Sequence, residues 1–63
     1  MTNYRISNRI SGADLGIFEG ATPLDAIKAL SRDCGYRSLE DEADTLGTTV
    51  EALIAEMRCD EVA

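Results

Sequence analysis

The sequence contains no histidine and no tryptophan, and its 63 residues include one proline, one phenylalanine and two cysteines. Without histidine the chain cannot form a Ser-His-Asp or Cys-His catalytic group, and it lacks the imidazole that most zinc sites use. Cys34 and Cys59 form no C-x-x-C pair, which excludes a thioredoxin-type redox motif. We therefore expect a non-enzymatic protein with no catalytic residue, no cofactor and no metal site.

Long apolar runs are also missing. The segment from Met1 to Arg9 lacks the uninterrupted apolar stretch of a secretion signal, and no window approaches the roughly 18 apolar residues of a membrane span. We expect a cytoplasmic protein with no membrane partner. In that reducing compartment Cys34 and Cys59 are expected to be buried free thiols, although a bridge between them stays open.

Motifs that bind phosphate or calcium are absent as well. The sequence holds neither G-x-G-x-x-G nor G-x-x-x-x-G-K-[ST], and its acidic residues do not follow the EF-hand pattern. A paired-carboxylate hydrolase would need one acid desolvated in a cleft, for which 63 residues offer little room.

Basic residues are scarce in the second half of the chain. The segment from Met1 to Arg37 has five bases and four acids, whereas Ser38 to Ala63 has one base, Arg58, and eight acids. The net charges of these segments are +1 and −7. A field of this kind attracts basic surfaces and repels nucleic-acid phosphates, so we expect no direct nucleic-acid binding.

The N-terminal part of the sequence predicts a β-hairpin. Apolar and polar residues alternate from Tyr4 to Ile10, with Ile10 on the apolar side, which is the pattern of a half-buried strand. Turn-forming residues follow at 11–14, and a second strand is predicted at 15–19. Gly16 marks a bulge or a close backbone approach within it.

A helix is predicted to begin at Pro23 and to stop at Gly35. Thr22 is a suitable N-cap, proline is favoured at the first helical position, and Gly35 can adopt the left-handed conformation of a C-cap. The expected apolar stripe comprises Ala26, Ile27, Leu30 and Cys34.

A second, short helix is predicted from Ser38 to Gly47. Ser38 followed by a carboxylate three residues later is a helix-start signal. Its apolar residues are Leu39, Ala43 and Leu46, and its polar face carries Glu40, Asp41, Glu42 and Asp44.

The last segment fits two patterns. Val50, Leu53, Ile54 and Met57 have helical spacing, whereas residues 55–60 alternate apolar and polar as a strand does. Because a two-stranded hairpin is barely stable alone, we favour a third strand from Leu53 to Cys59. The predicted fold is a single α+β domain over residues 1–63 in the order ββααβ, with a helix over residues 50–60 as the alternative.

The segment from Ala43 to Leu53 resembles the A-x-x-L-G-x-[ST] pattern of Cro/C1-type helix-turn-helix repressors. Its second helix would carry Glu51 and Glu56 with no base before Arg58, which DNA would repel.

A longer pattern runs from Tyr4 to Tyr36. It consists of Y-x-I, then S-G-x-x-L-G-x-F-E-G-x-T-x-x-D-A, then D-x-G-Y. It resembles small uncharacterised bacterial and phage-borne proteins, and its G-x-T-x-x-[DE]-A part resembles the hairpin-into-helix segment of HicB-type antitoxins. No catalytic residue transfers from either resemblance.

Taken together, these features predict a small acidic interaction protein that binds a partner with a basic surface. Its most concrete form is an inhibitor of a nucleic-acid-binding protein, of the anti-CRISPR kind, whose acidic face competes with nucleic acid. The expected contact residues are Glu40, Asp41, Glu42, Asp44, Glu51 and Glu56.

An alternative is an antitoxin-like or regulatory module that acts through its sheet edge, as a homodimer or with a cognate toxin. In that case Tyr4, Ile6 and Phe18 of the hairpin would matter more than the carboxylates.

Overall fold

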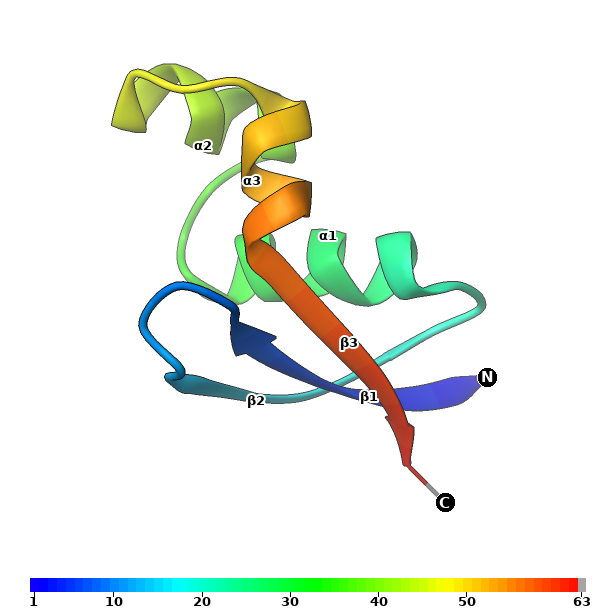
Figure 1. Ribbon diagram of the computed structural model, residues 1–63. Coiled ribbons are helices and arrows are strands. Elements are labelled where there is room, and N and C mark those ends of the chain that lie inside the picture. Colours follow the sequence, from blue (N-terminus) through cyan, green and yellow to red (C-terminus); the bar gives the residue numbers. More distant parts are fainter. Residues whose placement is uncertain (63) are drawn as a thin grey trace.

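A computed structural model describes residues 1–62 and confirms the α+β fold. The elements are β1 (Thr2–Asn8), β2 (Asp14–Gly20), α1 (Pro23–Asp33), α2 (Leu39–Leu46), α3 (Val50–Glu56) and β3 (Met57–Val62) (Figure 1). The hairpin comes first, the helices follow, and an antiparallel third strand completes the sheet. The order is therefore ββαααβ, with one helix more than the sequence predicted.

The additional helix lies in the segment that fitted two patterns. Val50 to Glu56 is helical, and Thr49 caps this helix by accepting a hydrogen bond from the backbone N–H of Ala52 at 3.1 Å. The strand begins only at Met57, so the predicted start at Leu53 is wrong. Both patterns were present because the helix and the strand follow each other without a linker.

The sheet has the strand order β2-β1-β3, which puts the first strand of the chain in the centre. Tyr4 lies opposite Phe18 of β2 and Glu61 of β3, and Ile6 lies opposite Gly16 and Cys59. Every pairing is antiparallel. The first and last strands of the described chain therefore lie side by side in the sheet.

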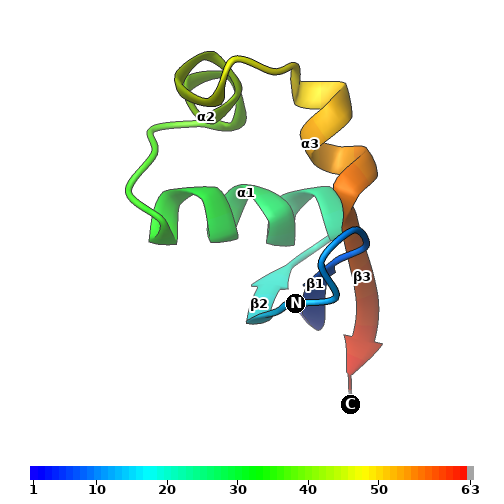
Figure 2. The ribbon, with the colours of Figure 1, turned by 60° about the vertical axis from the view of Figure 1, so that its left-hand side comes forward.

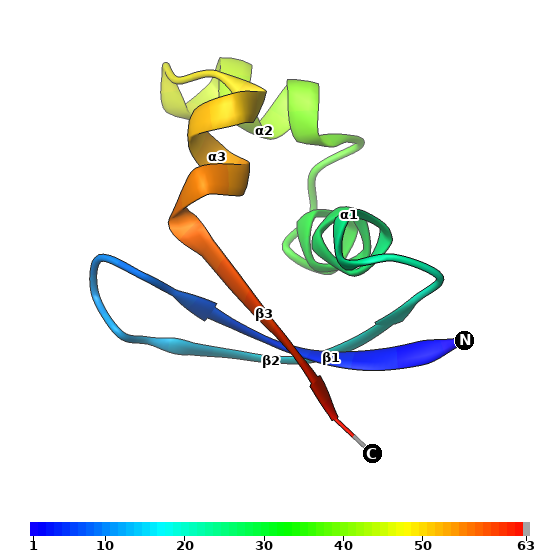
Figure 3. The same cartoon turned by 45° about the vertical axis from the view of Figure 1, so that its right-hand side comes forward.

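All three helices lie on one side of the sheet, as Figures 2 and 3 show from two directions. The side chains of Tyr4 and Ile6 point to that side and form the hydrophobic core with buried residues of the helices. These helical residues are Ala26, Ile27, Leu30 and Leu39. The opposite face of the sheet carries polar residues and the exposed Ile17.

The hairpin turn begins at Asn8. Its side-chain oxygen accepts hydrogen bonds from the backbone N–H groups of Ile10 and Ser11, at 2.8 and 2.9 Å. This local turn ends β1 and leaves Ile10 78% exposed, so the prediction that Ile10 continues the apolar face is wrong. The predicted irregularity at Gly16 is confirmed: the register between β1 and β2 shifts beside it, and its φ is +109°.

The first helix begins and ends as predicted. The hydroxyl of Thr22 accepts a hydrogen bond from the backbone N–H of Asp25 at 3.2 Å, and Gly35 has a φ of +97°. Its predicted apolar residues are buried except for Cys34, which is exposed because the helix has already ended at Asp33. Cys59 is half-buried, and both cysteines are free thiols.

Candidate functional site

The candidate site is the acidic lobe, by which we mean the two helices from Leu39 to Glu56. The hydroxyl of Ser38 accepts a hydrogen bond from the backbone N–H of Asp41 at 3.1 Å and so starts α2. Gly47 ends α2 with a φ of +71°, a left-handed conformation that favours glycine. Thr49 then caps α3. Three local signals, at Ser38, Gly47 and Thr49, therefore define where α2 and α3 begin and where α2 ends.

Three apolar residues hold the acidic lobe together and attach it to the protein. Leu39, Ala43 and Leu53 are buried. Leu39 belongs to the main core, and the half-buried Val50 and Ile54 of α3 pack against that core. The helix α2 lies above α1, on the side away from the sheet (Figures 1 and 3). The helix, glycine turn and second helix that the repressor-like pattern indicated are therefore present.

The six predicted contact residues all lie in this lobe but differ in exposure. Glu40, Asp44 and Glu51 are exposed, whereas Asp41, Glu42 and Glu56 are half-buried. Glu40 and Asp44 are four residues apart, which places them on the same face of α2. The structure thus brings the acidic residues onto one pair of helices and leaves three of them exposed.

Asp41 has a structural contact that the sequence analysis did not anticipate. One of its carboxylate oxygens accepts a hydrogen bond from the backbone N–H of Arg37 at 3.1 Å. Together with the cap at Ser38, this bond fixes the connection between α1 and α2. Asp41 therefore helps to position the lobe, and part of its carboxylate is already engaged.

No basic side chain neutralises the acidic lobe. The span from Leu39 to Glu56 contains neither lysine nor arginine. Within residues 1–62, the one ion pair joins Arg58 to Asp60 at 3.0 Å, and it lies outside the lobe on β3. No carboxylate of the lobe therefore forms an ion pair within residues 1–62, although Glu40 shares a small pocket with Lys28 and Arg32.

One large apolar residue of the lobe is exposed. Leu46 was predicted to lie on the buried side of α2, but it is 57% exposed at the C-terminal end of the helix. Leu46 has the helical spacing expected after Leu39 and Ala43, but no helix or strand of residues 1–62 covers its side chain. Leu46 follows Asp44 by two residues, so these two side chains lie on different sides of α2.

Two basic side chains lie next to the start of the acidic lobe. Lys28 and Arg32 of α1 line a small pocket of about 180 Å³ together with the start of α2, to which Ser38, Leu39 and Glu40 contribute. Their spacing of four residues on one helix was the signal available in the sequence. Arg5 lies on the outer face of the sheet, opposite Asp60. It therefore forms no continuous basic patch with Lys28 and Arg32 of α1.

The part of the chain that the structure describes contains neither a cluster of potential metal ligands nor a helix that could span a membrane. Among residues 1–62 no three acidic or cysteine side chains come close enough to hold a metal ion. None of the helices in that range has the length and apolar character needed to cross a bilayer. What the arrangement offers is a charged surface for contact.

Comparison of the chain with protein-family models, with curated proteins and with solved structures gives no match. The geometry of the acidic lobe and the charge of its residues are therefore the basis for a functional proposal.

Proposed function

We propose that this protein is a small non-enzymatic inhibitor that works in the cytoplasm and occupies a basic surface of a nucleic-acid-binding protein. The acidic lobe would be the contact surface. The observation that carries the proposal is that six carboxylates lie on the span from Leu39 to Glu56 without any lysine or arginine. The mode of action is that of an anti-CRISPR-like decoy, in which carboxylates take the place of phosphates.

The spacing of the exposed carboxylates supports this mode. Four residues along an α-helix correspond to about 6 Å, so Glu40 and Asp44 are separated by roughly the rise of two nucleotides along one strand, about 7 Å. A basic groove built for a sugar-phosphate backbone could therefore contact both groups. The same charges disfavour direct binding to nucleic acid.

Leu46 would add an apolar anchor to these charges. Exposed charges guide the approach of a partner and fix its orientation, whereas buried apolar contacts supply much of the affinity. Leu46 is 57% exposed at the end of α2, on a different side from Glu40 and Asp44, so a partner would bury it by extending around the end of the helix. We expect it to become buried in the complex.

The proposal is tested by competition. Purified nucleic-acid-binding proteins with basic grooves, CRISPR effector complexes among them, are loaded with a fluorescent oligonucleotide, and its displacement by this protein is followed at rising salt. We expect displacement to weaken as salt increases, because screening reduces attraction between exposed charges.

The variant Glu40→Lys/Asp44→Lys should weaken displacement at least about tenfold, since it reverses two exposed charges of the lobe. The matched control is Glu19→Lys/Asp33→Lys, which makes the same change in net charge at exposed residues outside the lobe. Displacement that ignores both salt and the lobe variant, or that responds equally to the control, contradicts the proposal.

A second candidate is the antitoxin-like or regulatory module that acts through its sheet edge. The outer edges of β2 and β3 pair with no other strand of residues 1–62, which favours such a contact. Tyr4 and Ile6 lie buried in the central strand, so they would support that edge from within and not touch the partner. Co-purification with the product of a neighbouring toxin gene would distinguish this function from the first.

A further inference from the structure

The outer edge of β3 exposes a defined set of backbone groups. In an antiparallel pair, hydrogen-bonded and non-hydrogen-bonded residue pairs alternate. The backbone N–H of Arg9 donates to the carbonyl of Glu56 at 2.8 Å, and this pair continues the register between β1 and β3. The alternation makes Ile6 and Cys59 a non-hydrogen-bonded pair. Cys59, and Glu61 two residues later, therefore direct their N–H and C=O groups away from β1.

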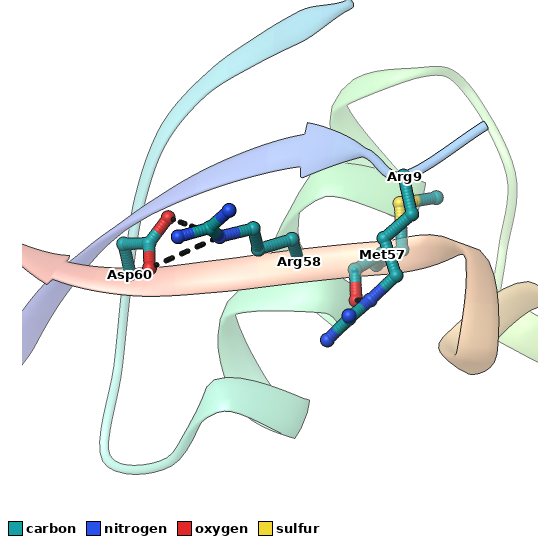
Figure 4. Close-up of polar contacts among 4 residues, drawn as sticks. All are labelled: Arg9, Met57, Arg58 and Asp60. Carbon is teal, nitrogen blue, oxygen red and sulfur yellow. Dashed lines mark hydrogen bonds and ion pairs between the residues drawn. The ribbon is translucent and has the colours of Figure 1, made fainter. Parts of the chain in front are cut away.

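Met57 also directs its backbone groups outward, but they already have partners. Its N–H donates to the carbonyl of Ile54, and its carbonyl accepts a hydrogen bond from Nε of Arg9 at 3.2 Å (Figure 4). A carbonyl oxygen can accept a second hydrogen bond. The groups free for pairing on this edge are thus those of Cys59 and Glu61, with one lone pair on Met57.

The other sheet edge is less suited to pairing. The register between β1 and β2 shifts at Ile6 and Ser7, so β2 contains a bulge beside Gly16. Bulges twist an edge strand and interrupt a regular ladder. The register of β3 against β1 runs from Val62 to Met57 without a shift.

The side chains of β3 form a pattern that complements itself. Arg58 and Asp60 are two residues apart on the outer face of the sheet, both are exposed, and they form an ion pair within the strand at 3.0 Å (Figure 4). If a second β3 strand lies antiparallel with Cys59 opposite Cys59, each arginine faces an aspartate across the contact. Shifting this register by two residues would place Asp60 opposite Asp60, and directly opposed like charges are destabilising.

We propose that two copies of this chain associate through their β3 edges, antiparallel and with Cys59 at the two-fold axis. Arg58 of each copy then lies opposite Asp60 of the second copy. Asp60 would have Arg5 of its own β1 on one side and Arg58 of the second copy on the other, because Arg5 is its partner in the existing register. The product is a continuous six-stranded sheet.

The two-fold axis of such a dimer is perpendicular to the sheet, which places the helices of both copies on the same side. Because α3 leads directly into β3, the two acidic lobes rise on either side of the contact. The association is independent of the inhibitor function, although it would double the charged surface. Its interface is small compared with the roughly 800 Å² that each partner buries in a stable complex, so dimerisation should depend on concentration.

The first test uses charge exchange and sedimentation equilibrium at protein concentrations up to about 1 mM. The single variants Arg58→Asp and Asp60→Arg should each weaken the dimer about tenfold or more, since each places like charges opposite each other. An equimolar mixture of the two variants should restore association, because every opposed pair is then complementary. Circular dichroism shows whether each variant keeps the fold.

The second test locates the two-fold axis by oxidation. In a Cys34→Ser background, diamide should convert two Cys59 thiols into one disulfide, with the two electrons and two protons passing to the diamide. Opposed residues in a hydrogen-bonded antiparallel pair have Cα atoms about 5.5 Å apart, within the range that disulfides span. Burial and the neighbouring Asp60 raise the pKa of the Cys59 thiol, and Arg9 partly offsets this, so the reaction is run at alkaline pH.

The proposal is wrong if the protein stays monomeric at about 1 mM, if the mixed variants do not associate, or if the dimer forms without a Cys59 cross-link. A dimer abolished by Ile17→Lys and unaffected by Arg58→Asp would assign the contact to the outer face or edge of β2 and so contradict the proposal. The variant Glu40→Lys/Asp44→Lys should leave the dimer intact, and monomeric Arg58→Asp should still displace nucleic acid. Failure of one proposal is therefore distinguishable from failure of the other.

Discussion

Gly20 shows how one residue determines the join between the hairpin and α1. It ends β2 and is buried, and a Cβ atom added there would lie 2.7 Å from the backbone nitrogen of Ala26 and 2.8 Å from Cβ of Asp25. Neither atom can move without moving the first turn of the helix. A hydrogen atom is therefore the side chain that lets α1 pack this closely on the sheet.

We predict that Gly20→Ala destabilises the protein by about 3 kcal/mol, since it forces backbone apart in the core. Gly12→Ala is the control: its φ is +76° but nothing lies within 4 Å of the added methyl group, so a cost of about 1 kcal/mol is expected. Urea unfolding followed by circular dichroism measures both values. Equal effects of the two substitutions would contradict the close packing at Gly20.

At the scale of the helix, the start of α2 positions the acidic lobe. Ser38 accepts a hydrogen bond from the N–H of Asp41, and its own carbonyl accepts one from the hydroxyl of the buried Ser31 at 3.3 Å. These bonds connect the cap of α2 to the core side of α1. The lobe is thus held by a few polar contacts as well as by Leu39.

We predict that Ser38→Ala lowers the free energy of unfolding by about 1 kcal/mol, which is the usual cost of losing a helix N-cap. Thr45→Ala, at an exposed position of the same helix, should be neutral or slightly stabilising because alanine is the better helix former. Thermal unfolding distinguishes them, since 1 kcal/mol corresponds to about 4–8 °C in a domain of this size. No difference between the variants would show that the cap contributes nothing.

The helix starts at Thr22 and Ser38 and the stops at Gly35 and Gly47 could be predicted because caps depend on neighbouring residues alone. The buried or exposed state of an apolar residue depends on what covers it. Leu46 and Ile10 fit their periodic patterns but are exposed, because the chain supplies no element over them within residues 1–62. The same limit applies to the site: the sequence identified the acidic residues, whereas the division between exposed Glu40 and half-buried Glu42 required the structure.

At the scale of the whole molecule, the separation of charge should govern stability as well as binding. The chain carries a net charge of −6 at neutral pH, and the acidic lobe holds six acidic residues and no base. Carboxylates crowded onto two short helices repel one another, and salt screens that repulsion over distances of about 10 Å at 0.1 M. The folded protein should therefore benefit from added salt.

We predict that the melting temperature rises by several degrees between about 10 and 300 mM sodium chloride. The variant Glu40→Gln/Asp44→Asn/Glu51→Gln removes three exposed negative charges from the lobe and should flatten this dependence. The neutral control Glu19→Gln/Asp33→Asn should retain most of it, because those residues lie outside the lobe. Stability that falls with salt would show that attractive pairs outweigh the repulsion.

The central position of β1 has a consequence for biosynthesis. Among the described elements β1 is translated first, yet its neighbour β3 spans Met57–Val62 and is translated last. Pairings between residues so distant along the chain slow folding relative to structures built from local contacts. Until β3 has been synthesised, β1 has one edge without a partner strand, so the hairpin and the helices before β3 cannot complete the sheet.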